Sequence, residues 1–275
     1  MRSIYDTTSQ WTTINNEKIP NADMISMYNV ENSTSAKSID PLKILRMDYG
    51  SFFLQGTEYS DKMCLNQNRN DRTDASGRLC VRSQPFISIN KISGSFSANS
   101  IVGLAPNFKS KSYVENLFSQ GQISDKIVGL NYEDPNDQNS VSTVSFGYYD
   151  FNQIMYGEQG LSYFDNIGLN VWALILKDMK FKGQSLQTGN QGERMAVIDS
   201  ANTTIQIPTS QFQKFKEILL SQDPTVTEAD MDGETVLTSR KSCSYLQNIY
   251  GDLTFNLSSS LITIKPKGYL FNLPN

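Results

Sequence analysis

The sequence contains no histidine among its 275 residues. Ser-His-Asp and Cys-His catalysis both need an imidazole as the general base, and the usual zinc-protease helix motif needs two imidazoles as metal ligands. The composition therefore excludes all three classes of hydrolase. If this protein catalyses hydrolysis, carboxylates are the natural acid and base.

Long apolar runs and concentrated positive charge are also missing. No apolar run approaches the roughly 20 residues that a membrane-spanning helix needs. The net charge of −4 is modest and comes without the basic stripe of a nucleic-acid-binding surface. We therefore expect neither a membrane span nor a nucleic-acid partner. Since 38% of the residues are hydrophobic, the chain is long and apolar enough for two lobes with their own cores.

Cysteine is scarce, with three residues in the chain. Cys64 and Cys80 flank a polar segment rich in Asn, Asp and Arg, and they can close a short surface loop by a disulfide; the alternative is two free thiols. Cys243 is then left over. Residues 32–34 (Asn-Ser-Thr) and 256–258 (Asn-Leu-Ser) fit the N-glycosylation pattern, a weak signal that often arises by chance. Together these features favour a secretory route.

Residues 196–208 carry the first pattern that points to chemistry. An apolar run ends at Asp199, small polar residues follow, and apolar residues resume before Pro208. Val197 and Ile198 predict the end of a buried strand, because β-branched residues suit a pleated, covered surface. Burial at the end of a strand can shift the pKa of a carboxylate and so suit it to acid–base chemistry. Taken alone, the pattern fits an aspartate in an ordinary turn equally well.

The same pattern occurs at residues 4–14. Apolar residues precede Asp6, the hydroxyl-bearing residues 7–9 follow it, and a return strand is predicted near Ile14. Two copies of a strand-Asp-turn-strand pattern indicate a duplicated architecture that supplies one aspartate from each half. Two carboxylates brought together can act as a general acid and a general base.

Both copies resemble the paired Asp-Thr/Ser-Gly-Thr/Ser loops of the pepsin-like (eukaryotic) aspartic proteases. The resemblance implies an all-β, bilobal fold with two β-barrel-like lobes, residues 1–155 and 156–275, and a cleft between them. It implies that Asp6 and Asp199 are catalytic and activate a water that cleaves a peptide or protein substrate. It implies no metal and no organic cofactor. We expect a monomer that follows the secretory route to the lysosome, the vacuole or the extracellular space.

The resemblance also assigns residues that support the two loops. Thr7 and Ser200 carry hydroxyls that cross-link the loops in the family, and the Ser9 hydroxyl is expected to bond the first aspartate. Asn202 offers an amide where a hydroxyl is usual.

The two loops depart from the family pattern at one position each. The glycine that follows Asp-Thr/Ser is replaced by Thr8 in the first loop and by Ala201 in the second. We expect the β-branched Thr8 to be crowded and strained there. Two functions therefore remain open: an active endopeptidase, or an inactive pepsin-like homologue that binds peptides or partners without cleaving them.

Further segments resemble elements that surround the family's active site. Residues 42–48 and 52–56 predict a β-hairpin, with Gly50 supplying a positive φ at its turn. Tyr49, Gly50 and Ser51 then stand where the substrate-covering flap of the family lies. Ile101, Val102 and Gly103 resemble the strand that supports the first loop. Residues 113–120 and 211–220 predict short helices.

The family pattern extends beyond the given residues at both ends. A pro-segment and first strands precede the first aspartate in the family, whereas residues 1–5 here predict a strand and no signal peptide. A partner for Cys243 and the supporting strand of the second lobe come later in the family than Asn275. The resemblance therefore implies that this chain is a fragment, an incomplete gene product or a degenerate copy.

Overall fold

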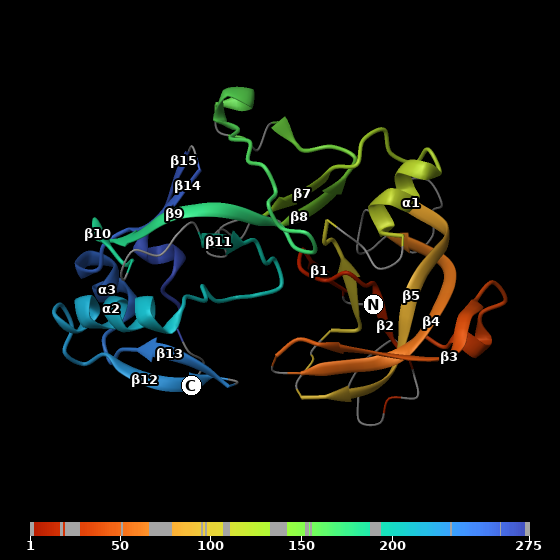
Figure 1. The fold of residues 1–275 in the computed structure, drawn as a ribbon, viewed down its shortest axis with the longest axis horizontal. Coiled ribbons are helices and arrows are strands. Elements are labelled where there is room, and N and C mark those ends of the chain that lie inside the picture. The colour runs from red at the N-terminus through yellow and green to blue at the C-terminus, as the bar shows by residue number, and fades with distance from the viewer. Residues whose placement is uncertain are drawn as a thin grey trace. The chain divides into compact units, whose positions relative to one another are not determined.

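The fold is mostly β. The computed structural model describes residues 3–16, 19, 28–50, 52–65, 79–94, 96, 98–106, 111–132, 142–151, 154, 156–187, 194–231, 233–258 and 260–272 (Figure 1). Strands account for 44% of the structure and helices for 16%, which confirms the predicted predominance of strands. The chain divides into two compact units: unit 1 comprises Met1–Tyr163 and Leu169–Val171, and unit 2 comprises Phe164–Gly168 and Trp172–Asn275.

Unit 1 is built on a six-stranded sheet. Its strands are β1 (Ser3–Asp6), β2 (Thr13–Asn15), β3 (Lys37–Asp48), β4 (Phe53–Leu65), β5 (Leu79–Ser93) and β6 (Ser100–Gly103). They lie in the order β1-β6-β2-β5-β4-β3. The pairs β1/β6 and β2/β5 are parallel, and the other neighbours are antiparallel. The strand that ends at Asp6 is therefore held beside a strand almost 100 positions later in the chain.

The long strands β3, β4 and β5 form an antiparallel meander (Figure 1). The predicted hairpin is confirmed, since β3 and β4 pair from Asp48 and Phe53 outwards and Gly50 has a φ of 78° at the turn. A positive φ costs glycine nothing because it has no Cβ. Ser51 lies outside the described residues.

A short helix and a second hairpin complete unit 1. Helix α1 (Tyr113–Ser119) begins with a capping box, in which Ser112 Oγ accepts from Glu115 N (3.1 Å) and Glu115 Oε2 accepts from Ser112 N (3.0 Å). The predicted helix and its glycine stop are confirmed, as Gly121 follows with a φ of 67°. Strands β7 (Val128–Asn131) and β8 (Thr143–Phe146) pair antiparallel, and 3-10 helices η1 (Val30–Asn32) and η3 (Gly157–Gly160) lie in the connections.

Unit 2 combines a smaller sheet with two helices. Its strands are β9 (Ala173–Phe181), β10 (Gln184–Ser185), β11 (Arg194–Val197), β12 (Thr227–Met231), β13 (Glu234–Thr238), β14 (Leu253–Leu257) and β15 (Ser260–Ile264). The sheet order is β10-β9-β14-β15, β11 also pairs with β9, and β12 and β13 form a separate hairpin. The helices are α2 (Thr209–Leu220), α3 (Cys243–Ile249) and the 3-10 helix η4 (Pro266–Gly268). Helix α2 confirms the prediction for residues 211–220.

Each unit has its own hydrophobic interior. In unit 1, one cluster includes Leu54, Ile87 and Ile101, and another includes Val102 and Tyr113. The cluster of unit 2 draws on α2, α3 and the sheet, and it comprises Met179, Phe181, Leu186, Leu219, Val226, Leu246, Tyr250 and Leu253. The candidate functional loops extend from these packed sheets.

Candidate active site

Asp6 is the last residue of β1, the edge strand of the unit 1 sheet. In the parallel pairing it lies opposite Gly103, and its carbonyl oxygen accepts a hydrogen bond from Leu104 N at 2.8 Å. Asp6 is 2% exposed. The main-chain bonds on this side therefore fix the position from which the carboxylate projects.

The loop after β1 is folded around one oxygen of the Asp6 carboxylate. Oδ1 accepts hydrogen bonds from Thr8 N (2.8 Å), Thr8 Oγ1 (2.7 Å) and Ser9 N (3.1 Å). Hydrogen bonds to an ionised carboxylate are stronger than hydrogen bonds between neutral groups, so these three bonds stabilise the charged form of Asp6. Thr7, which lies between Asp6 and Thr8 in the chain, is buried.

The structure corrects the expectation for Ser9, whereas the expected crowding of Thr8 where the two loops meet stays a prediction. Thr8 is absent from the described residues with positive φ, so its backbone is not in the left-handed region. Its hydroxyl supplies a bond to Asp6 that glycine could not make. The Ser9 hydroxyl does not bond Asp6; it donates to Trp11 O at 3.0 Å, and Ser9 contributes its main-chain N–H to Asp6 instead.

The Ser9 hydroxyl connects the loop to the predicted flap. Ser9 Oγ and Tyr49 Oη lie 3.2 Å apart, and the Tyr49 ring stacks on Phe52 with ring centroids 4.9 Å apart. Burial raises the pKa of Tyr49 to about 12, the bond from Ser9 opposes that shift, and the negative charge of Asp6 adds to it. The phenol is thus a neutral hydrogen-bonding group beside the Asp6 loop at any pH at which proteins normally work.

The predicted supporting strand lies beside the same loop. Ile101, Val102 and Gly103 belong to β6, where the first two are fully buried in the two clusters of unit 1. Just after β6, Ala105 N donates to Ser9 O at 3.2 Å. The structure therefore brings this strand, the Asp6 loop and Tyr49 together in unit 1.

Asp199 lies in unit 2, two residues after β11. Its Oδ1 accepts a hydrogen bond from Ala201 N at 2.9 Å. This bond matches the one from Thr8 N to Asp6, since each aspartate accepts from the main chain two residues later. The two loops thus share one local turn, although Ala201 has no hydroxyl to add a second bond.

The rest of the second loop is held by other contacts. Asn202 Oδ1 accepts from Thr204 N and from Thr204 Oγ1, both at 2.9 Å. Thr204 Oγ1 also lies 3.3 Å from Glu234 Oε2 on β13. Asn202 therefore fixes the turn that follows Asp199 rather than bonding Asp199 itself. Ser200 is half-buried.

The predicted burial of the second pattern is wrong. Val197 and Ile198 are 48% and 46% exposed. Within the described residues, β11 pairs with β9 alone, so it is an edge strand with little cover. The predicted return strand is also absent from residues 204–208, which have no assigned secondary structure and lead directly into α2. The duplication therefore holds for the strand, the aspartate and the turn, but not for the strand that follows.

Two other carboxylates, one in each unit, are buried and organise the loops around them. Asp61 accepts hydrogen bonds from Ser33 Oγ (2.6 Å), Ser35 Oγ (2.5 Å), Lys62 N (2.6 Å) and the Tyr28 hydroxyl. Asp223, which the sequence pattern did not single out, accepts from Thr225 and Ser239 in unit 2. Their partners are hydroxyls and main-chain groups, so both residues are structural.

The expected disulfide is confirmed. Cys64 on β4 and Cys80 on β5 are bonded and lie directly opposite each other in the antiparallel register. Cys243 is a free thiol that donates to Asn272 Oδ1 at 3.2 Å. The family resemblance and the disulfide both point to the secretory route.

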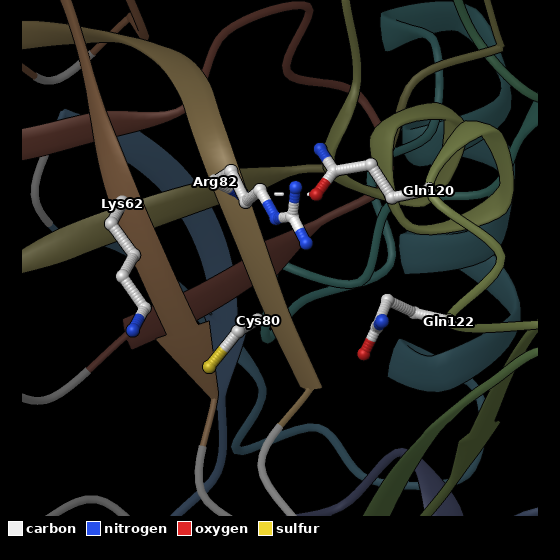
Figure 2. Close-up of a pocket in the computed structure, with 5 residues that line it drawn as sticks. All are labelled: Lys62, Cys80, Arg82, Gln120 and Gln122. Carbon is white, nitrogen blue, oxygen red and sulfur yellow. Dashed lines mark hydrogen bonds between the residues drawn. The ribbon is translucent and has the colours of Figure 1, made fainter.

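A cavity of about 310 Å³ lies beside the disulfide. Lys62, Cys80, Arg82, Gln120 and Gln122 line it (Figure 2). Gln120 Oε1 accepts from Arg82 N at 3.1 Å, which joins the segment after α1 to β5. None of the predicted catalytic or flap residues lines this polar cavity, so it is separate from the candidate site.

No cluster of three or more His, Cys, Asp and Glu residues suited to a metal ion occurs in the part of the chain that the structure describes. Over the same residues, no helix has the length and apolar character to span a membrane.

Comparison with protein-family models identifies one family. A family model described as Eukaryotic aspartyl protease matches residues 3–274, a span that includes Asp6 and Asp199. No curated protein matches the chain.

Proposed function

Because this chain belongs to the eukaryotic aspartyl protease family, we propose that it is an aspartic endopeptidase in which Asp6 and Asp199 form the catalytic pair. One observation carries the proposal: each aspartate lies at or just after the end of a strand, and its Oδ1 accepts a hydrogen bond from the main-chain N–H two residues later, at 2.8 Å and 2.9 Å. Residues 1–155 and 156–275 act as two lobes that contribute one carboxylate each.

The chemistry follows from two carboxylates that share one proton. Like charges a few ångströms apart do not both ionise readily, and aspartic proteases are the standard example of such a pair. The ionised member takes a proton from a bound water, whose oxygen forms a bond to the peptide carbonyl carbon. The protonated member donates to the carbonyl oxygen. The C–N bond then breaks as a proton passes to the leaving amine. The titration belongs to the pair, so neither aspartate is assigned a fixed role.

The surrounding residues position this pair. Thr8 and Ser9 hold the Asp6 carboxylate through three hydrogen bonds, and Ala201 holds Asp199 through one. Asn202 fixes the turn after Asp199 through its bonds from Thr204, and the hydroxyls of Thr7 and Ser200 take the cross-linking role that they have in the family. In this mechanism the hairpin with Tyr49, Gly50 and Ser51 covers the bound peptide and excludes water.

The substrate is a peptide or protein segment in extended conformation, and the protein acts as a monomer. Its place is an acidic compartment of the secretory route, the lysosome or vacuole, or the extracellular space. Acidic conditions suit the mechanism because one carboxyl of the pair must stay protonated.

The test is cleavage of a mixed peptide library across acidic pH, paired with binding of a statine-type transition-state mimic. The proposal expects cleavage at acidic pH and its inhibition by the mimic. Binding of the mimic by a folded protein that never cleaves the library would favour the second function, a pepsin-like binder. This alternative rests on the replacement of both family glycines, by Thr8 and by Ala201.

A further inference from the structure

Three Asn-X-Ser/Thr sequences, at Asn32, at Asn256 and at Asn202, lie in different local structures. In the third, the Asn202 carboxamide oxygen accepts from Thr204 N and from the Thr204 hydroxyl, both at 2.9 Å, so the acceptor amide and its hydroxyl partner are bonded to each other in the turn after Asp199. Asn32 is the last residue of the 3-10 helix η1, in a connection of unit 1. Asn256 lies within β14, in the middle of the unit 2 sheet. The sequence pattern alone treats the three positions alike, and the structure separates them.

The Asn32 turn is fixed through other residues. Asn29 Oδ1 accepts from Glu31 N at 2.8 Å and from Asn32 N at 3.3 Å, which caps η1. The side chain of Asn32 is exposed, as is that of Thr34, which supplies the hydroxyl of the acceptor sequence. Asn32 therefore contributes its main chain to the turn and presents its carboxamide to solvent.

The two serines that alternate with Asn32 and Thr34 bond to Asp61 on β4. Ser33 Oγ and Ser35 Oγ donate to the buried Asp61 carboxylate at 2.6 Å and 2.5 Å. The segment is thus attached to β4 through its odd-numbered serines, while Asn32 and Thr34 remain outside that attachment. A large polar group on Asn32 leaves these bonds in place.

The surroundings of Asn256 are crowded by comparison. It is half-buried and pairs with Asp178 on β9 on one side and with Leu261 on β15 on the other. The next residue, Leu257, is 3% exposed. Glycan transfer accompanies synthesis and precedes folding. A modified Asn256 would therefore have to be accommodated while β14 pairs on both edges.

Ser258, which supplies the hydroxyl of the Asn256 acceptor sequence, is restrained as well. Ser258 has a φ of 40°, in the left-handed region that favours glycine. Its N–H donates to Ile175 O at 3.1 Å, and its carbonyl accepts from Lys177 Nζ at 2.5 Å. These two bonds restrain the backbone at the serine of this acceptor sequence.

We propose that Asn32 is an N-glycosylation site and that Asn202 and Asn256 are not modified. The donor is an oligosaccharide linked through a diphosphate to a membrane lipid. Asn32 Nδ2 forms a bond to the anomeric carbon of the first sugar and gives up one proton. The bond between that carbon and the diphosphate oxygen breaks, and the lipid diphosphate leaves with the electron pair. The glycan is hydrophilic and projects into solvent beside η1.

The test uses the full chain preceded by a cleavable secretory signal sequence and translated with microsomes. Only chain protected from added protease is scored, with Cys64–Cys80 oxidation as a second marker of the lumen. The readouts are the mobility shift on treatment with an N-glycosidase and the mass of the glycopeptide. The variants are Asn32→Gln, Thr34→Ala, Asn256→Gln and Ser33→Ala. Ser33→Ala is the matched control for Thr34→Ala, since each removes one hydroxyl from the turn but only the second destroys the acceptor sequence.

One glycan is expected on the wild type, on Ser33→Ala and on Asn256→Gln, and none on Asn32→Gln or Thr34→Ala. Protected, oxidised wild-type chain without a glycan would overturn the proposal. So would a shift that persists in Asn32→Gln or disappears in Asn256→Gln. Because the readout is a covalent modification, its outcome is independent of whether the protein proves to be a peptidase.

Discussion

The hydroxyl oxygens of Ser9 and Tyr49 lie 3.2 Å apart, and this contact joins the loop after Asp6 to the turn between β3 and β4. The two residues are 40 positions apart in the chain. Tyr49 is held from its other side by the stacked ring of Phe52, and Tyr49 N donates to Phe52 O at 2.9 Å across the turn. The hairpin tyrosine is thus positioned by its own turn and by the candidate catalytic loop together.

Removing the phenol oxygen should weaken catalysis more than folding. Tyr49→Phe keeps the ring stack on Phe52 but loses the bond to Ser9, which is worth about 0.5–1.5 kcal/mol, or up to about tenfold in kcat/KM. We expect Ser9→Ala to give a similar loss and the double variant to add little to either. The measurement is kcat/KM with a cleavable peptide, alongside denaturant unfolding. Fully additive losses would show that the two hydroxyls act separately.

The Thr8 hydroxyl should stabilise the first loop. Thr8→Val keeps the shape of the side chain but removes the donor to Asp6 Oδ1, and hydrogen bonds to charged groups contribute about 1.5–3 kcal/mol. We expect the free energy of unfolding to fall by that amount in Thr8→Val and to change little in Thr8→Ser. Thr8→Gly, which restores the family residue, should lose stability as well. A Thr8→Gly protein more stable than the wild type would support the interpretation that Thr8 is crowded.

What the sequence predicts well in this protein is local. The strand ending at Asp6, the hairpin around Gly50 and the helix before Gly121 are specified by residues within a few positions of each other, so their patterns suffice. The Cys64–Cys80 pair was also found, because its two residues flank one polar segment.

What the sequence predicts poorly depends on which distant segments meet. The hydroxyl donors to Asp61 lie 26 to 33 positions away, and no local pattern marks them. The exposure of Val197 follows from the position of β11 at an edge, which its β-branched composition does not reveal. The bond from the Thr8 hydroxyl to Asp6 was not predicted, because the family's glycine directed attention to the conformation of the loop and not to a hydroxyl donor.

Asp61 should make the stability of unit 1 dependent on acid pH. Burial raises its pKa, but hydrogen bonds from Ser33, Ser35, Tyr28 and the Lys62 N–H outweigh this and hold the pKa below the ordinary 3.8. A carboxyl with a depressed folded-state pKa contributes stability that is present above the unfolded-state value and is lost as the pH falls through the folded-state value. The contribution therefore persists at the mildly acidic pH expected for catalysis.

Asp61→Asn tests this dependence. At neutral pH the variant should unfold about 1–3 kcal/mol more easily than the wild type, because several buried donors lose a charged acceptor. The gap should narrow as the pH falls below 3.8, where the wild-type carboxyl also becomes neutral. Denaturant midpoints measured across this pH range give the difference directly. A gap that is constant with pH would mean that the charge of Asp61 contributes nothing.

The Cys64–Cys80 disulfide should stabilise unit 1 by restricting its unfolded chain. The two cysteines are separated by 16 positions, and a bond closing a loop of that size contributes about 3 kcal/mol in the chain-entropy account. The double variant Cys64→Ala/Cys80→Ala should lose about that much on denaturant unfolding. Reduction of the wild type with dithiothreitol should reproduce the loss, and unit 2 should be unaffected. An equal destabilisation of both units would contradict an effect confined to the β4–β5 pair.

The most direct test of the central claim is kcat/KM at acidic pH for four proteins: the wild type, Asp6→Asn, Asp199→Asn and the double variant. Asparagine keeps an oxygen that can accept from Thr8, Ser9 and Ala201, so both loops should retain their folds. We predict a loss on the order of 10³-fold or more in each single variant, and no greater loss in the double variant, because groups that act as one unit are not additive. Cleavage that survives in either single variant, with its inhibition by a statine-type mimic intact, would contradict the assignment of Asp6 and Asp199 as a catalytic pair.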